Sequence, residues 1–190
     1  MMRRFIHALA LFEIMAICVV LLGAFWVQFG KNEYPCPLCI VQRMAMMLCA
    51  LGPALIVMDG LKSRDIPAAT VMAGYGMSIL GAVVGLAASL RQVLLHILPD
   101  DPGYGAAVMG LHLYTWATIV FLVVLVFSGA RLLLAPNFTA DPGPNRTVSR
   151  IVLWIFGLVL AANAVSTLFE AGFHAFLPAN PTSYRLLSGD

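Results

Sequence analysis

Residues 5–29, FIHALALFEIMAICVVLLGAFWVQF, form a 25-residue stretch with one carboxylate and no lysine or arginine. About 20 helical residues cross a hydrocarbon core of roughly 30 Å, so this stretch is long enough to span a bilayer. The preceding MMRR, residues 1–4, resembles the start of a signal peptide. The apolar run is nevertheless too long for a signal sequence, and no small-x-small cleavage site precedes Lys31. The stretch therefore predicts a retained membrane helix.

The whole chain shares this apolar character. Its 190 residues are 61% hydrophobic and 11% charged, with a mean hydropathy of +0.92. Soluble domains are nearer half apolar and one quarter charged, so lipid must form part of the solvent of this chain. The net charge of +2, without a cluster of basic residues, gives no indication of nucleic acid, and we expect none as a partner.

Four further apolar segments follow, at residues 38–58, 67–98, 111–134 and 151–169. The third of the five segments is glycine-rich, which allows close helix packing. It is also too long for a simple span, so its last turns, from Arg91 on, are expected to leave the membrane. We predict an all-α integral membrane protein. Its expected parts are a four-helix bundle in residues 1–135, a cytoplasmic linker at 136–150, and a fifth transmembrane helix with an external tail in 151–190.

The basic residues predict how the bundle is oriented. With the N-terminus in the cytoplasm, four basic residues lie outside: Lys31, Arg43, Arg91 and Arg185. Seven lie on the cytoplasmic side: Arg3, Arg4, Lys62, Arg64, Arg131, Arg146 and Arg150. Five spans then place the C-terminal tail and the cysteines Cys36 and Cys39 outside, on the oxidising side in a bacterium. We therefore expect a multi-pass protein of the bacterial inner membrane.

Two of the four cysteines, Cys36 and Cys39, form a Cys-x-x-Cys motif between the first two apolar segments. This spacing is typical of half of a zinc site or of a redox dithiol. Zinc needs four ligands, and Cys18 and Cys49 lie inside apolar runs, where small core residues are expected. A helix that begins near Pro37 would stabilise a thiolate at its N-terminus. We therefore favour the redox interpretation and expect no metal.

Arg43 lies four residues after Cys39, on the same helix face, with no acidic residue within a helical turn. One interpretation is an interfacial arginine whose guanidinium reaches the headgroups. The other is a cation held beside the dithiol to bind an electron-rich partner, such as a quinone carbonyl or a thiolate.

Polar residues elsewhere are interpreted as structural. Glu13, in the first helix, is expected to be protonated or paired at the cytoplasmic end. Glu170 and His174 are four residues apart, which predicts a surface pair on the last helix.

Residues 35–43, PCPLCIVQR, resemble the first-loop motif of the DsbB family, the membrane quinone reductases that reoxidise the periplasmic thiol oxidase DsbA. The resemblance extends to Gln28, which precedes Cys36 by the family's distance. It also includes ALFE at residues 10–13, RQV at 91–93 and GLHLYTW at 110–116. The similarity covers roughly residues 5–134.

The resemblance implies a role for each matching residue. Cys39 would attack a bound ubiquinone or menaquinone, and Cys36 would be its disulfide mate and the cysteine that an incoming thiol reaches. Arg43 would contact the quinone, and Gln28 is a further candidate for binding it. Gln92 stands where some members carry a quinone-side histidine. His96, one turn further along, is a candidate substitute for it, with an interfacial histidine as the alternative.

The loop at residues 99–110 departs from the family pattern because it contains no cysteine. The family carries a second pair there, which exchanges with DsbA. The donor, a periplasmic thioredoxin-like thiol protein of the DsbA type, must therefore reach Cys36 directly, or another cysteine-bearing partner must supply the missing pair. The fifth helix is a second departure.

The function expected from these residues is a thiol:quinone oxidoreductase that supports disulfide formation. An alternative is a membrane subunit or anchor of a redox complex, with the dithiol used for docking or assembly. A metal-binding or metal-transport protein is a third possibility.

Overall fold

The computed structural model describes residues 2–63, 65–105, 107–134, 145–174, 177–178 and 180–188. Within them all regular structure is helical, apart from isolated bridge residues such as the pair Val108 and Leu111. The elements are α1 (Met2–Phe25), a short π-helical turn η1 (Trp26–Gly30), α2 (Pro37–Lys62), α3 (Ala68–Leu95), α4 (Leu113–Leu134), α5 (Arg146–Ala171) and α6 (Arg185–Ser188). Helices α1 to α5 are long and apolar enough to cross a membrane. The expected all-α membrane bundle with a fifth helix is confirmed.

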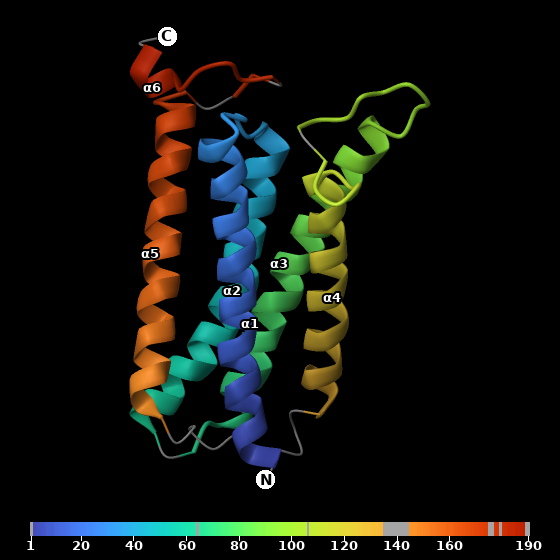
Figure 1. The fold of residues 1–190 in the computed structure, drawn as a ribbon. Helices are drawn as coiled ribbons and strands as arrows, with labels where there is room; N and C mark the ends of the chain where they lie inside the picture. Colours follow the sequence, from blue (N-terminus) through green and yellow to red (C-terminus); the bar gives the residue numbers. More distant parts are fainter. Residues whose placement is uncertain are drawn as a thin grey trace.

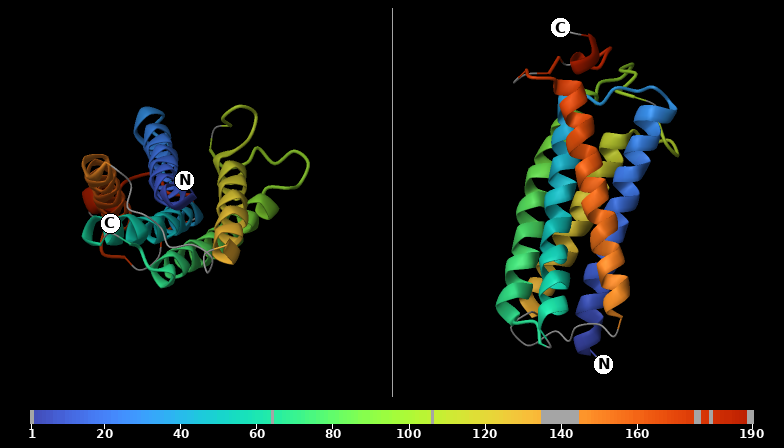
Figure 2. Two further views of the ribbon diagram at one scale, coloured as in Figure 1. Left: turned by 90° about the horizontal axis from the view of Figure 1, so that it is seen from below. Right: turned by 90° about the vertical axis from the view of Figure 1, so that its left-hand side faces the viewer.

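The five long helices run up and down the bundle side by side (Figure 1). Helix α2 contacts α1, α3 and α5, while α4 packs on α3 at the side away from α5 (Figure 2). The segment before α2, the connection between α3 and α4, and the C-terminal tail all lie at one end of the bundle, opposite the N-terminus (Figure 1). The dithiol, the cysteine-free loop and the tail therefore share one end.

Several helix boundaries differ from expectation; α2, for example, runs to Lys62 instead of ending at residue 58. Helix α3 ends at Leu95 rather than at residue 98, and His96 closes it by donating its backbone N–H to Val93. Helix α5 begins at Arg146 because Asn145 caps it, accepting a bond from the Val148 backbone at 3.3 Å. Residues 146–150, the end of the expected linker, are thus helical. Residues 136–144 of that linker lie outside the described residues.

Glycine lets the backbones of α2 and α3 touch. A Cβ atom on Gly52 would lie 2.0 Å from the Gly74 carbonyl oxygen, and one on Gly74 would lie 2.7 Å from the Gly52 oxygen. Gly85 makes room for the Phe121 ring of α4 in the same way. Membrane helices associate through such close packing, because apolar burial alone gives little driving force in lipid.

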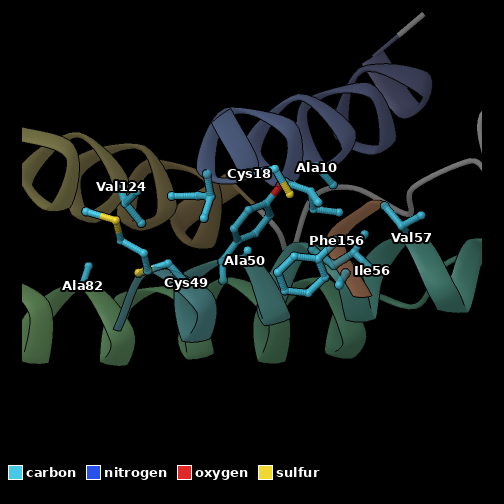
Figure 3. Close-up of a cluster of buried hydrophobic side chains, with 14 of the residues drawn as sticks. Ala10, Cys18, Cys49, Ala50, Ile56, Val57, Ala82, Val124 and Phe156 are labelled. Atoms are coloured by element: carbon cyan, nitrogen blue, oxygen red, sulfur yellow. The ribbon is translucent and has the colours of Figure 1, made fainter. Parts of the chain in front are cut away.

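The middle of the bundle is a continuous apolar core (Figure 3). Cys18 and Cys49 are both fully buried in it, with no exposed surface, as expected from their apolar surroundings. Toward the end opposite the dithiol, Arg131 of α4 donates to the carboxylate of Glu13 on α1. The expected pairing of Glu13 is therefore present.

Candidate functional site

The two cysteines of the motif stand at the first turn of α2. Cys36 is its N-cap residue, and Pro37 occupies the first helical position, where a missing N–H has no cost. The backbone N–H of Cys39 donates to the sulfur of Cys36 at 3.2 Å. Both cysteines are free thiols in the structure, Cys36 buried at 5% exposure and Cys39 half-buried. The dithiol is thus built into a helix N-terminus, where a negative sulfur is favoured.

This position makes Cys36 acidic. Its hydrogen bond with the Cys39 side chain lowers the pKa of Cys36 to about 7, although burial acts in the opposite direction. Hydrogen bonds from the Cys39 and Leu38 backbones and from Gln92 contribute to this lowering. A substantial fraction of Cys36 is therefore thiolate at neutral pH, which is the nucleophilic form of the residue.

Gln92, near the end of α3, contacts the dithiol directly. Its Nε2 lies 3.3 Å from the Cys36 sulfur and 3.7 Å from the Cys39 sulfur, as a donor to both. Gln42, one turn after Cys39 on α2, donates to Gln92 Oε1 at 2.8 Å. Gln42 thus holds the Gln92 oxygen, to which the Cys39 sulfur also donates at 4.0 Å, while the NH2 group of Gln92 faces both sulfurs.

A cavity of about 400 Å³ opens beside the dithiol. Its walls come from α1, η1, the segment before α2, α2 itself, the end of α3, the α3–α4 connection and α4. The surface is mainly apolar, with Trp26 and Trp116 among its aromatic residues. Its polar and reactive lining includes Cys39, Arg43, Gln28, Gln92 and Gln42. This combination is typical of a small-molecule site.

Arg43 points from α2 across to the end of α1. Its Nη1 donates to Gln28 Oε1 at 2.6 Å, and its Nη2 donates to the Ala24 carbonyl at 3.3 Å. The guanidinium carbon also lies 5.4 Å from the centre of the Phe25 ring, within range of a cation–π contact. The guanidinium is therefore held against α1 at the cavity wall.

Gln28 connects this arginine to the C-terminal part of the chain. Its Nε2 donates to Ser166 Oγ at 2.9 Å and Glu170 Oε1 at 2.6 Å, both on α5, and to Tyr184 Oη at 3.2 Å. Gln28 is buried inside η1, where the helix widens by one residue per turn. The structure thus brings Cys36, Cys39, Arg43, Gln28 and Gln92 together at one end of the bundle.

His96 lies away from this group and does not line the cavity. Its Nδ1 is 3.0 Å from Asp101 Oδ1, and its ring stacks on Tyr114 at 5.7 Å between centroids. The Gly103 backbone N–H and, to a smaller degree, His96 hold the pKa of the exposed Asp101 below its ordinary value. The bend that follows Leu95 turns His96 toward the loop rather than along the face of Gln92.

The α3–α4 connection closes over the dithiol end of the cavity. Tyr104 and Gly105 are part of the cavity wall, and Tyr104 Oη donates to the Tyr34 carbonyl at 2.6 Å. Burial and then the nearby Cys36 raise the pKa of Tyr104 above its ordinary value, so its hydroxyl stays a donor. Together with the burial of Cys36, this arrangement covers the dithiol at this end of the bundle.

Sequence reasoning missed several residues of this site. Glu170 is buried, at 3% exposure, so its expected position at the surface is wrong. Its carboxylate instead bonds to Gln28, 142 residues away in the chain. Ser166, Tyr184 and Gln42 were likewise not identified. Of these, only Gln42 had a local signal, because it lies three residues after Cys39 on the same helix. Among the described residues no group of three His, Cys, Asp or Glu side chains is placed to hold a metal ion.

Comparison with known proteins gives one family. Residues 4–131 match the family model "Disulfide bond formation protein DsbB". The chain is 39% identical over 87 residues to disulfide bond formation protein B of Chromobacterium violaceum, covering 45% of this chain and 49% of that protein. It is 34% identical over 98 residues to the protein of that name from Burkholderia pseudomallei, covering 51% and 52%.

A third relative, disulfide bond formation protein B 2 of Burkholderia lata, is 29% identical over 132 residues, covering 58% of this chain and 79% of that protein. The first two matches span about half the length of those relatives. No solved structure matches the chain. The matched family segment ends before α5, so the partners of Gln28 on α5 and in the tail lie outside it.

Proposed function

The chain belongs to the DsbB family of disulfide bond formation proteins, and from this membership we propose that it is a membrane thiol:quinone oxidoreductase. It takes two electrons from an external dithiol through Cys36 and Cys39 and passes them to a bound ubiquinone or menaquinone. The observation that carries the proposal is the shared cavity, which Cys39, Arg43 and Gln28 all line.

The cavity suits a quinone ring in size and chemistry. Its volume of about 400 Å³ lies within the range of small-molecule pockets, and its mainly apolar wall suits a flat, lipid-soluble ring. Arg43 provides a fixed cation beside Cys39 that would hold a quinone carbonyl. When bound, the quinone supplies a two-electron acceptor that leaves as the quinol after taking up two protons.

The residues of the chain perform the thiol chemistry. A thiolate of the donor attacks the Cys36 sulfur of the Cys36–Cys39 disulfide, the S–S bond breaks, and Cys39 leaves as a thiolate. The second donor thiolate then attacks the donor's own sulfur in the mixed disulfide, and Cys36 leaves. Its lowered pKa makes Cys36 a good leaving group in this step. The donor is now a disulfide, and its two electrons reside on the Cys36–Cys39 dithiol.

The second half-reaction restores the disulfide. Cys39 faces the cavity beside Arg43, and Cys36 lies behind it, within reach of the Cys39 backbone. The two sulfurs would close their bond again by giving up two electrons and two protons, and a quinone held beside Arg43 would be their acceptor. In sum, one donor dithiol and one quinone become one donor disulfide and one quinol.

The donor is a periplasmic thioredoxin-like thiol protein of the DsbA type or another cysteine-bearing partner. The loop at residues 99–110 has no cysteine, so the donor thiol reaches Cys36 itself. Because Cys36 is buried beside the loop that carries Tyr104, that loop must move aside in the encounter. The protein is a multi-pass membrane protein, and we propose that the dithiol end and the tail face the periplasm.

The test is thiol-driven quinone reduction by the purified protein in detergent. The reaction is monitored by the change in quinone absorbance. Cys36→Ser and Cys39→Ser are expected to abolish it. Cys49→Ser is the matched control, because Cys49 is buried in the core, where it donates to the Ser78 carbonyl, and a serine can keep that bond. Full activity in Cys39→Ser would contradict the proposal. Inactivity of the wild type alone, restored by a co-purifying protein, would favour a subunit of a redox complex.

A further inference from the structure

The end of α5 contacts the candidate site although it lies outside the family match at residues 4–131. Glu170 is buried at 3% exposure, and its Oε1 accepts from Gln28 Nε2 at 2.6 Å. Gln28 Oε1 in turn accepts from Arg43 at 2.6 Å. A buried carboxylate on the fifth helix is thus joined to the arginine of the cavity through a single amide group.

The direction in which the Gln28 amide points is decisive in this chain of contacts. A carboxamide has one accepting oxygen and one donating NH2 group, and a guanidinium only donates. Arg43 can therefore bond to Gln28 only when the oxygen faces α2 and the NH2 group faces α5. The opposite orientation would set two donors against each other, and would leave a half-buried cation without that partner.

Glu170 is the neighbour that selects the first orientation. The hydroxyls of Ser166 and Tyr184 also lie near Gln28 Nε2, but a hydroxyl both donates and accepts and so tolerates either end of an amide. An ionised carboxylate only accepts, so it requires the NH2 group of Gln28. In its ionised form Glu170 also places a negative charge one amide away from Arg43, where a low local dielectric makes the attraction stronger than in water.

We propose that Glu170 is a positioning residue for Arg43: by accepting from the Gln28 amide, it holds the Gln28 oxygen toward Arg43 and the guanidinium at the wall of the cavity. The inference rests on the proposed function, in which Arg43 holds a quinone carbonyl. It assigns to the fifth helix a role in quinone affinity, although the dithiol chemistry is carried by α2.

The variants Glu170→Leu and Glu170→Gln separate this role from simple packing. Leucine removes the acceptor, so Arg43 loses its fixed position, and KM for quinone rises about tenfold while KM for the thiol donor is unchanged. Glutamine keeps one accepting oxygen without the charge, so its KM for quinone rises about threefold. A merely structural residue would change both KM values, or the amount of folded protein, together.

Quinone binding can be measured without turnover. Trp26 and Trp116 line the cavity, so a bound short-chain ubiquinone analogue quenches their fluorescence, and a titration of Cys39→Ser protein gives its Kd. On this background Glu170→Leu is expected to weaken binding about tenfold. Ser149→Ala is the matched control, because it removes the 2.9 Å contact between Ser149 of α5 and His7 of α1 at the other end of the same helix pair. It should leave Kd unchanged.

The outcomes distinguish the two proposals. If the wild type neither binds nor reduces quinone, the proposed function fails and the role of Glu170 falls with it. If the wild type is active and Glu170→Leu and Glu170→Gln keep its Kd and KM for quinone, only the role of Glu170 is overturned. An equal loss in Ser149→Ala would also overturn it, because docking of α5 alone would then explain the effect. Should Glu170→Leu fail to fold, the threefold change in Glu170→Gln decides.

Discussion

The side-chain amide of Gln92 donates to the sulfur of Cys36 across 3.3 Å, so the end of α3 stabilises the first cysteine of α2. Gln42 fixes this amide by occupying its oxygen at 2.8 Å. Two helices therefore lower the pKa of Cys36: α2 through the backbone at its N-terminus, and α3 through the side chain of Gln92. Because these donors stabilise the thiolate more than the thiol, their effect can be measured from the pH dependence of Cys36 reactivity.

The reactivity of Cys36 is expected to titrate near neutral pH. Below its pKa of about 7 Cys36 is a thiol, and above it a thiolate, so alkylation by iodoacetamide should rise through pH 7 and level off above pH 8. An ordinary cysteine would rise about two pH units later. Mass spectrometry of the peptide that carries Cys36 measures the rate, with Cys36→Ser as the blank. A midpoint near 9 would show that these hydrogen bonds do not stabilise the Cys36 thiolate.

Gln92→Leu is expected to move that midpoint upward. Leucine fills a similar volume and removes the donor, and a hydrogen bond to a charged group contributes about 1.5–3 kcal/mol, so the midpoint should rise by about one to two pH units. Gln42→Leu is the matched comparison, because it frees the Gln92 amide to turn without removing it. A smaller upward movement is expected there. An unchanged midpoint in Gln92→Leu would show that Gln92 does not stabilise the Cys36 thiolate.

The sequence was sufficient to predict the helices and the dithiol, but not the contacts around Arg43. A segment that crosses lipid must be apolar throughout, so hydropathy locates each span. For the same reason both faces of such a helix are apolar, and the pattern does not say which face meets another helix. Gln28 and Glu170 are 142 residues apart, and nothing local in the chain joins them. The neighbouring His174 suggested a surface pair instead.

His96 illustrates a different limit. Its assignment to the site assumed that α3 continues, which would place His96 one turn beyond Gln92 on the same face. The helix ends at Leu95, and the turn that follows gives His96 a partner in Asp101 of the loop. Helix ends depend on local capping and loop contacts, so an inference that extends a helix by a single turn is the first to fail.

The ion pair of Glu13 and Arg131 should matter for stability. Arg131 donates to Glu13 between α4 and α1, and its guanidinium lies 5.1 Å from the centre of the Tyr75 ring. Arg131→Leu leaves a buried carboxylate without its partner, which typically costs about 3–5 kcal/mol. Thermal unfolding in detergent should show a clear fall in Tm, largely reversed in the double variant Glu13→Leu/Arg131→Leu. Arg150→Gln, at an exposed position, is the control and should leave Tm unchanged.

Because α2 and α3 are in close contact, alanine substitutions at two glycines should differ sharply in their effect on stability. A Cβ atom at Gly52 would meet the Gly74 carbonyl at 2.0 Å, and backbone cannot move aside as a side chain can. Gly52→Ala should therefore destabilise the protein by about 1–3 kcal/mol. Gly76→Ala is the matched control because a Cβ atom there meets nothing within 4 Å, and alanine favours helix. Equal melting temperatures for the two variants would contradict the packing.

The Tyr104 hydroxyl should control access to Cys36. It donates to the Tyr34 carbonyl at 2.6 Å and so ties the α3–α4 connection to the segment that leads into the dithiol. Tyr104→Phe keeps the ring and removes this bond, so the loop opens more often and alkylation of Cys36 at pH 9 should become about three to ten times faster. At pH 9 the cysteine is already thiolate, so the change reports access rather than ionisation. Trp116→Phe, which removes a bond from the Trp116 ring to the Val108 carbonyl in the same loop, is the comparison. If it accelerates alkylation as much as Tyr104→Phe does, the whole loop, and not the Tyr104–Tyr34 contact, governs access.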